Sequence, residues 1–165
     1  MEPEKKISFL KLIRELNRGK IRYLVIGRRA VILYGGPVLT GDTDLWIHPE
    51  DKRRVLSLLL DKLSLELSDS PDTKKPIVSG FSGMRKFDFF FQKSVKNFED
   101  QVIGFEGCYE NSVLKKDPKE DINFRIPSID DLIRLKKIRK QNIKDEQDIE
   151  YLLKAKRLFR NSNKK

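Results

Sequence analysis

The sequence has few of the residues that build covalent cross-links or thiolate sites. Its 165 residues include one cysteine, Cys108, and one histidine, His48. A single cysteine cannot form an intrachain disulfide, which favours a reducing compartment, and we expect a cytoplasmic protein. The same scarcity excludes a zinc site of the usual Cys/His type. Any metal ion bound by this protein would therefore need oxygen ligands.

Long apolar runs are also missing. No stretch approaches the roughly 18 apolar residues of a membrane-spanning helix. Charged residues interrupt the apolar segment at 9–14 too early for a secretory signal, so we expect no membrane association. The length suits one domain with a buried core, and no linker or repeat divides it. We expect a single domain over residues 1–165, ending in a frayed basic tail at 160–165.

Positive charge is in excess, with 35 Lys and Arg against 25 Asp and Glu and a formal net charge of +10. A basic surface attracts polyanions such as nucleotides and RNA. A general enrichment in lysine that keeps the surface soluble explains the same charge equally well. The charge therefore indicates candidate partners and does not indicate a fold.

Helical and β patterns alternate along the chain. Apolar residues at helical spacing predict helices, which fall at 9–16, 30–34, from 49 onward, 128–138 and 145–159. Runs of β-prone residues predict strands at 22–26, 42–47 and 86–91, with weaker ones at 101–105 and 122–126. The polar segment 68–76 predicts a loop. The pattern is typical of an α/β (α+β) protein in which helices flank a mixed β-sheet and the C-terminal end is helical.

Two acids lie close together in Gly41-Asp42-Thr43-Asp44. Alternate residues of a strand share a face, so both carboxylates lie on one side, roughly 6.5 Å apart along the strand. That spacing suits a pair of divalent metal ions completed by substrate phosphate oxygens. The alternative is two ordinary surface acids at a solvated strand end. Trp46 shares their face and would either stack on a base or pack under the following helix.

A third acid, Asp88, lies within the aromatic run at 86–91. An ionised carboxylate among aromatic side chains is costly unless it is paired or bound to a metal. Next to the other two acids it would complete a two-metal site and could accept a proton from an attacking hydroxyl. The alternative is a local ion pair with Lys86 on the same strand.

Gly27 separates the first predicted strand from a short helix. Such a turn presents free backbone N–H groups to an anion, and a glycine permits close approach to the backbone. Together with the acids that follow, it predicts a cleft with phosphate donors on one wall and carboxylates on the other.

These segments resemble the polymerase-β-like nucleotidyltransferase superfamily. Residues 25–35, Val-Ile-Gly-Arg-Arg-Ala-Val-Ile-Leu-Tyr-Gly, and 40–47, Thr-Gly-Asp-Thr-Asp-Leu-Trp-Ile, look like its strand, glycine turn and Asp-x-Asp motif. The runs at 128–136 and 144–149 are similar to those of a small bacterial branch that includes abortive-infection toxin nucleotidyltransferases. The resemblance covers the chain from about Tyr23 to Leu153.

The resemblance implies a minimal nucleotidyltransferase fold. It implies an enzyme that transfers a nucleoside monophosphate from a nucleoside triphosphate, such as ATP, to a hydroxyl of RNA, a protein or a small molecule. Asp42, Asp44 and Asp88 would be catalytic and hold Mg²⁺ or Mn²⁺, while Gly27 and Lys136 would bind the nucleotide. The alternative is a catalytically silent module of this fold that binds a nucleotide, RNA or a protein partner, as one half of a toxin–antitoxin pair.

Arg28 departs from the family pattern, in which a small residue follows the glycine. Its guanidinium would either bind phosphate, which preserves activity, or occupy the place of the phosphate, which suggests a binding-only relative. Arg29 is expected to face solvent. Lys136, on a largely apolar helix face, would either reach the rim or meet an anion in a cleft. Asp145 and Asp148 are expected to complement the dipole at the start of the last helix.

Overall fold

The computed structural model describes residues 7–139 and 142–162. Its central sheet has five strands in the spatial order β1 (Tyr23–Ile26), β2 (Asp42–Ile47), β5 (Arg85–Phe90), β4 (Ile77–Ser82) and β3 (Glu66–Leu67). Strands β2 and β5 are parallel, and the other neighbours are antiparallel. This is the mixed sheet that the sequence predicts.

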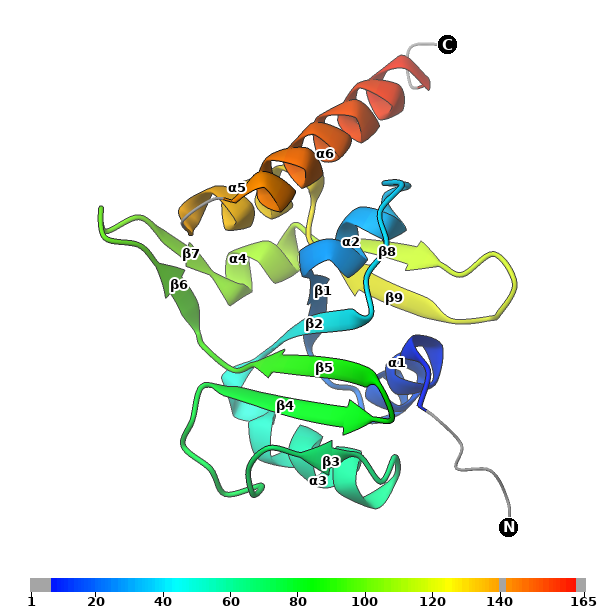
Figure 1. Cartoon of the computed structure of the whole chain (residues 1–165), viewed down its shortest axis with the longest axis vertical. Coiled ribbons are helices and arrows are strands. Elements are labelled where there is room, and N and C mark those ends of the chain that lie inside the picture. The colour runs from blue at the N-terminus through cyan, green and yellow to red at the C-terminus, as the bar shows by residue number, and fades with distance from the viewer. Residues whose placement is uncertain (1–6, 140–141, 163–165) are drawn as a thin grey trace.

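Six α-helices and two hairpins surround the sheet in the described part of the chain. The helices are α1 (Phe9–Arg18), α2 (Gly27–Leu33), α3 (Lys52–Asp61), α4 (Phe105–Glu110), α5 (Ile129–Ile138) and α6 (Ile143–Ser162), with a short 3-10 turn η1 (Pro49–Asp51). The hairpins are β6 (Ser94–Lys96) with β7 (Val102–Gly104), and β8 (Val113–Lys116) with β9 (Asn123–Ile126). Figure 1 shows α6 at one end of the molecule and α3 at the other, with the central sheet between them.

Local sequence signals set several of these helix boundaries. Ser8 caps α1, since its hydroxyl accepts a hydrogen bond from the Lys11 N–H at 3.1 Å. Ser128 caps α5 in the same way, accepting from Asp131 N–H at 3.1 Å. Helix α6 continues to Ser162, so the predicted tail is helical at 160–162, and its last three residues lie outside the described residues. No described helix is both long enough and apolar enough to cross a membrane.

The two faces of the sheet pack against different elements. One face holds the main core, in which Leu45, Ile47, Phe87 and Phe89 lie with apolar residues of α1 and α3. The other face carries Trp46, whose indole N–H donates to the Gln92 carbonyl at 2.7 Å and whose ring meets Phe105 edge-on. Packing is therefore the role of Trp46, against α4 rather than under the helix that follows β2.

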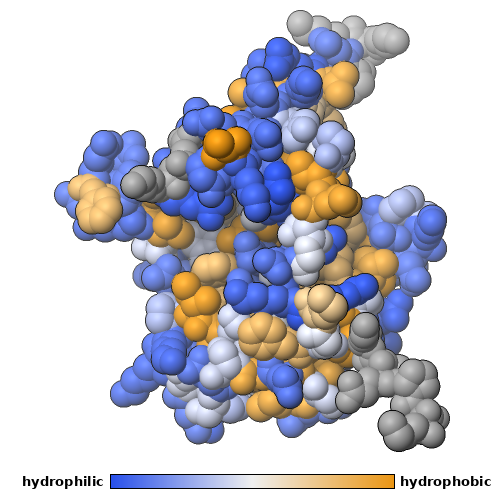
Figure 2. All heavy atoms as spheres, in the orientation of Figure 1, coloured by the Kyte–Doolittle hydropathy of each residue, from blue (hydrophilic) through white to orange (hydrophobic). Residues whose placement is uncertain are grey.

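Helices α2, α5 and α6 form a third apolar cluster. Its buried members are Ala30, Val31, Leu132, Ile133, Ile149 and Leu152. This cluster holds the first half of α6 against the rest of the protein, whereas Leu158 near its end is 71% exposed. Figure 2 shows hydrophilic side chains over most of α6 and hydrophobic patches over the visible face of the sheet.

Candidate functional site

The predicted acids lie on the two strands at the centre of the sheet. In the parallel pairing of β2 with β5, Asp44 lies opposite Asp88 and Asp42 lies opposite Lys86. Residues two apart on a strand share a face, and paired residues on neighbouring strands do so too. The three carboxylates are therefore on one face of the sheet, the face that also carries Trp46. The structure brings the predicted acids together.

Asp44 lies at the centre of this group. Burial raises the pKa of its carboxyl to about 6, and the negative charges of Asp88 and Asp42 act in the same direction. The positive charges of Arg139 and Lys136 oppose the shift only in part. A half-buried carboxylate that two other acids repel is stabilised by a bound cation, so the electrostatics of this face favour a metal ion.

Asp88 is held by neighbours on both sides. The Ser79 hydroxyl, on β4, donates to Asp88 Oδ1 at 2.5 Å. Lys86 Nζ lies 3.5 Å from Asp88 Oδ2, so the predicted local ion pair is present. The Lys86 side chain is 42% exposed, and an exposed pair of this kind contributes little stability. The ion pair therefore orients Asp88 without removing it from the group of acids.

Gly27 approaches the site through its backbone. It is the first residue of α2, has a φ of +67°, and follows Ile26, which pairs with Asp44 across β1 and β2. A Cβ at this position would lie 2.6 Å from Asp44 Oδ2. Glycine is therefore required here for the close approach of the helix start to the Asp44 carboxylate, as well as for the left-handed φ.

We expect Gly27→Ala to destabilise the protein by about 1–3 kcal/mol, because alanine is strained at this φ and its methyl collides with Asp44. Denaturant unfolding of the two proteins measures the difference. Gly107→Ala is the matched control, since Gly107 lies in α4 and a Cβ there meets no atom within 4 Å. Equal unfolding free energies for the parent and Gly27→Ala would contradict the prediction.

Lys136 lies in a buried network of ion pairs. Its Nζ is 3.0 Å from Asp148 Oδ2 and 3.9 Å from Asp145 Oδ1, and the side chain is 4% exposed. Arg28 Nε lies 3.3 Å and 3.4 Å from the two oxygens of Asp148, and Arg139 donates to Asp145. Lys136 thus does not reach the rim but meets an anion, and that anion is the protein's own carboxylate.

The network also includes other charged residues that were singled out near the site. Arg28 lines the polar side of the site and is tethered to Asp148 of α6, with its side chain 25% exposed, and its role toward phosphate stays a prediction. Asp145 and Asp148 are almost fully buried and ion-paired, so the helix dipole alone does not account for them. The expectation for Arg29 was wrong, because its side chain is half-buried over the Phe9 ring, 5.4 Å from the ring centroid.

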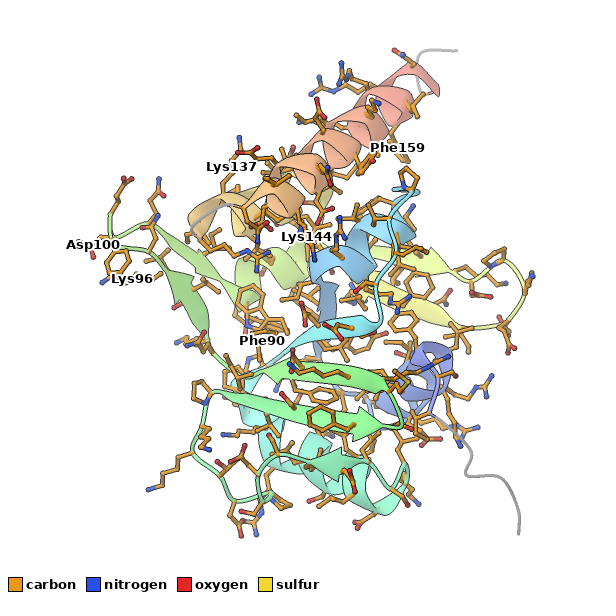
Figure 3. All side chains as sticks on the ribbon, in the orientation of Figure 1. Phe90, Lys96, Asp100, Lys137, Lys144 and Phe159 are labelled. Carbon is orange, nitrogen blue, oxygen red and sulfur yellow. The ribbon has the colours of Figure 1, made fainter. Side chains whose placement is uncertain are left out.

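Two clefts meet at Asp44. The polar cleft, of about 210 Å³, runs from Asp42 and Asp44 to the start of α6, where it is lined by Lys144. The apolar cleft, of about 190 Å³, lies on the other side of Asp44 and is walled mainly by apolar side chains: Ile26, Trp46, Ile77, Phe90, Val95, Leu132, Leu135 and Ile138. In Figure 3, Phe90 lies on the sheet and Lys144 lies toward it from the base of α6. Gly27, Lys136 and Arg139 line both clefts.

Comparison with known proteins gives a result at the level of structure only. Neither a protein-family model nor a curated protein sequence matches the chain. The lincosamide antibiotic adenylyltransferase LnuA, solved with lincomycin bound, is similar with a TM-score of 0.66 and 13% identity, over 92% of this chain and 99% of LnuA. The chain has the nucleotidyltransferase fold.

Two further structures agree with this fold. TM1012 of Thermotoga maritima, assigned to the nucleotidyltransferases, matches with a TM-score of 0.58 and 13% identity, over 94% of this chain and 90% of its own. The antibiotic-resistance factor ANT(2'')-Ia matches with a TM-score of 0.55 and 12% identity, over 92% of this chain and 89% of its own. At these identities the likeness is one of fold, and the abortive-infection branch stays a prediction.

Within the nucleotidyltransferase fold, the acids present the kind of donor that Mg²⁺ or Mn²⁺ prefers, since all are carboxylate oxygens. Among residues 7–139 and 142–162, no three acidic, histidine or cysteine side chains form a ready-made metal cage. Magnesium sites commonly use one or two carboxylates and take their other ligands from water and substrate phosphates. The acids therefore fit a cation that arrives together with a nucleotide.

Sequence reasoning did not identify three residues of the site. Ser79 gave no signal, because a serine in a weakly patterned segment has no particular chemistry. Arg139 follows the helix predicted at 128–138, and Lys144 begins the run at 144–149 that carries part of the family resemblance, but neither residue was assigned a role. Asp148 was expected only as a partner of the helix dipole, although it pairs with both Lys136 and Arg28. Its spacing of three residues from Asp145 already placed both acids on one helix face.

Proposed function

We propose that this protein is a metal-dependent nucleotidyltransferase, which transfers a nucleoside monophosphate from a nucleoside triphosphate to a hydroxyl acceptor. The observation that carries the proposal is the placement of Asp42, Asp44 and Asp88 on one face of two adjacent parallel strands, with Asp44 at the point where the polar and apolar clefts meet. Charges of one sign are held together there at a cost in stability. Such a cost is typical of sites that bind a cation or stabilise a reaction.

The reaction is an in-line displacement at phosphorus. The acceptor oxygen forms a bond to the α-phosphorus, and the bond from that phosphorus to the bridging oxygen of the leaving pyrophosphate breaks. The hydroxyl proton passes to Asp88, whose carboxylate the Ser79 hydroxyl holds in place. Mg²⁺ or Mn²⁺ bound by Asp42, Asp44 and Asp88 would neutralise charge on the α-phosphate and on the leaving group.

The nucleotide phosphates would lie in the polar cleft. Lys144 and Arg139 line it from the start of α6 and the end of α5. No described carboxylate lies within ion-pair distance of Lys144, which makes it the first candidate for a phosphate contact. Lys136 also lines the polar cleft and would add positive potential there, while its ion pairs hold it to α6.

The acceptor would use the apolar cleft, where Trp46 and Phe90 offer an apolar wall next to Asp44. LnuA was solved with lincomycin bound. A small organic acceptor agrees with both observations. RNA is the alternative acceptor that the basic composition supports, and binding that weakens steeply as salt is raised would favour it.

A catalytically silent binding module is the second candidate function. One observation favours it: Asp148 neutralises both Lys136 and Arg28, two of the cations expected at the phosphates. In that case nucleotide would still stabilise the folded protein, and no pyrophosphate would be released.

Nucleotide binding and turnover distinguish the candidates. With Mg²⁺ present, we expect nucleoside triphosphates to raise the melting temperature and to be converted to pyrophosphate when a suitable hydroxyl compound is supplied. Chelation of the metal, or the double change Asp42→Asn with Asp44→Asn, should remove both responses. Asp72→Asn is the control, because Asp72 is an exposed acid that pairs with Arg53 and lines neither cleft.

Two results would count against these assignments. A double variant that responds to metal and nucleotide as the parent does would show that Asp42 and Asp44 are not ligands. A melting temperature that rises with nucleotide while no labelled α-phosphate is transferred to any tested acceptor would support the silent module instead.

A further inference from the structure

A separate cleft lies on the other side of the segment that leads into β2. It has a volume of about 350 Å³ and is lined by Phe9, Arg29, Thr40, Gly41, Thr43, Arg85 and Phe87. Its charged lining residues are both arginines, and no acidic side chain lines it. The cleft shares Thr40 with the polar cleft of the carboxylate site. We call it the arginine cleft.

Arg29 is fixed in the wall of the arginine cleft. Its Nε donates to Thr43 Oγ1 and its Nη2 to the Thr40 carbonyl, both at 3.4 Å. The guanidinium also lies over the Phe9 ring. A guanidinium has five N–H donors, so these two bonds leave others available to a ligand. Arg29 is therefore a positioned cation whose hydrogen-bonding capacity is not exhausted within the protein.

Arg85 places a second positive charge near the first. It is the exposed first residue of β5 and lines the same cleft. Burial lowers the pKa of Arg29, and the like charge of Arg85 lowers it further. Within residues 7–139 and 142–162, no carboxylate oxygen lies within 4 Å of a guanidinium nitrogen of Arg29 or Arg85. Two neighbouring arginines without an acid repel each other, and an anion bound between them relieves that repulsion.

We propose that Arg29 and Arg85, with the hydroxyl of Thr43, form a binding site for a phosphate group that is separate from the carboxylate site. Guanidinium groups match the geometry of phosphate oxygens, and the Thr43 hydroxyl supplies a neutral donor next to them, whereas the Thr40 hydroxyl donates to the Asp42 carbonyl. The apolar floor of Phe9 and Phe87 lowers the local dielectric and strengthens those contacts.

The arginine cleft lies close to the carboxylate site, and two kinds of ligand would bring a phosphate to it. Asp42 follows directly after Gly41, so a phosphate in the arginine cleft lies across the start of β2 from the carboxylates. A free polyphosphate would occupy the cleft alone, whereas a polynucleotide strand would bring a backbone phosphodiester to it. The shared chemistry is the phosphate group, and the site does not depend on whether nucleotide transfer takes place.

Calorimetric titration tests the site, with inorganic pyrophosphate and a short single-stranded oligonucleotide as separate probes, at low salt and without divalent metal. We expect Arg29→Gln with Arg85→Gln to weaken binding by roughly ten-fold or more. The dependence of oligonucleotide affinity on salt should also become shallower, because fewer phosphate contacts release counterions. Preference for pyrophosphate would identify a free phosphate ligand, and preference for the oligonucleotide would identify a strand.

Three variants make the test specific. Arg53→Gln removes an exposed arginine of α3 and should retain parental affinity. Arg85→Gln alone changes an exposed side chain, so it should fold as the parent does and still weaken binding several-fold. Asp42→Asn with Asp44→Asn should retain phosphate binding, which separates this site from the proposed activity. Parental affinity in the Arg29/Arg85 variant, or no binding of either probe by the parent, would overturn the proposal.

Discussion

Asp44→Asn is expected to reduce nucleotide transfer by about 100-fold or more and, at the same time, to stabilise the metal-free protein. The loss of activity follows because a carboxylate that holds the metal contributes several kcal/mol to transition-state stabilisation. The gain in stability follows because the ionised Asp44 carboxylate is disfavoured in the folded protein by burial and by Asp88 and Asp42. Asparagine keeps the shape of the side chain and removes the charge.

The size of the stability effect depends on pH. The pKa of Asp44 is raised from 3.8 to about 6 on folding, so the folded protein binds this proton more tightly than the unfolded chain. The stabilisation that this bound proton gives the folded protein is complete below about pH 4 and is lost as the pH rises through about 6. The parent should therefore be less stable than Asp44→Asn by about 1–3 kcal/mol at pH 7.5, and the difference should disappear near pH 4.

Thermal unfolding at several pH values measures this difference, which corresponds to roughly 2–4 °C per kcal/mol for a chain of this length. Addition of Mg²⁺ with nucleotide should stabilise the parent and not the variant. Asp72→Asn again serves as the control, and it should show the pH dependence of the parent and the parent's response to Mg²⁺ with nucleotide, because Asp44 is unchanged. A variant that is less stable than the parent at pH 7.5 in the absence of metal would contradict the electrostatic account of Asp44.

Asp148→Ala is expected to have the largest effect on stability, a loss of about 3–5 kcal/mol. Asp148 is fully buried and is the shared partner of Lys136 and Arg28. Its removal leaves the Lys136 ammonium buried with only Asp145, at 3.9 Å, as a partner, and breaking a buried ion pair from one side has a cost of this size. Denaturant unfolding measures it.

Two comparisons show whether the loss of stability in Asp148→Ala comes from the unpaired charge of Lys136. Glu150→Ala changes an exposed acid of the same helix and should alter stability by less than about 0.5 kcal/mol. Replacement of the pair by Lys136→Met with Asp148→Leu should recover much of the loss, because the buried Lys136 charge is gone, Asp145 keeps Arg139, and the Arg28 guanidinium is partly exposed. If the double variant is as unstable as Asp148→Ala, packing and not charge explains the effect.

The sequence predicts the centre of the fold well, because the two-residue period of a strand and the 3.6-residue period of a helix are both clear there. The strand expected at 86–91 is β5 at Arg85–Phe90, and the helix expected at 128–138 is α5 at Ile129–Ile138. Strand β4 was not expected, since it contains Ser79-Gly80 and ends at Ser82. The structure gives the reason: a Cβ at Gly80 would lie 3.3 Å from the Phe89 ring. Tertiary packing selects glycine where strand propensity disfavours it.

The weaker pattern at 101–105 shows a second limit. The strand is present as β7 but ends at Gly104, and Phe105 begins α4. Phe105 is an apolar residue that suits either a strand or a buried helix position, and its contact with Trp46 decides the outcome. Residues far away in the chain make that contact, so a local pattern cannot show it.

For the site, sequence spacing predicts which acids share a strand face but not what surrounds them. The two-residue alternation of Asp42 and Asp44 was sufficient to place them together, and Asp88 had to be inferred from its aromatic neighbours. The contact of Arg28 with Asp148 joins α2 to α6 across most of the chain, and no periodicity reports it. Arg29 was expected in solvent because the position of Phe9 above it depends on how α1 packs.

The parallel pairing of β2 with β5 has a consequence for folding kinetics. Asp44 and Asp88 are neighbours on strands that are separated in the chain by α3, β3, β4 and the turn of the β4–β5 hairpin. Parallel pairs need such a long crossover, and contacts between residues distant in sequence form late and slowly. A partially folded chain therefore displays separate acids rather than a cluster, and the repulsion among them arises only when the sheet that contains it is complete.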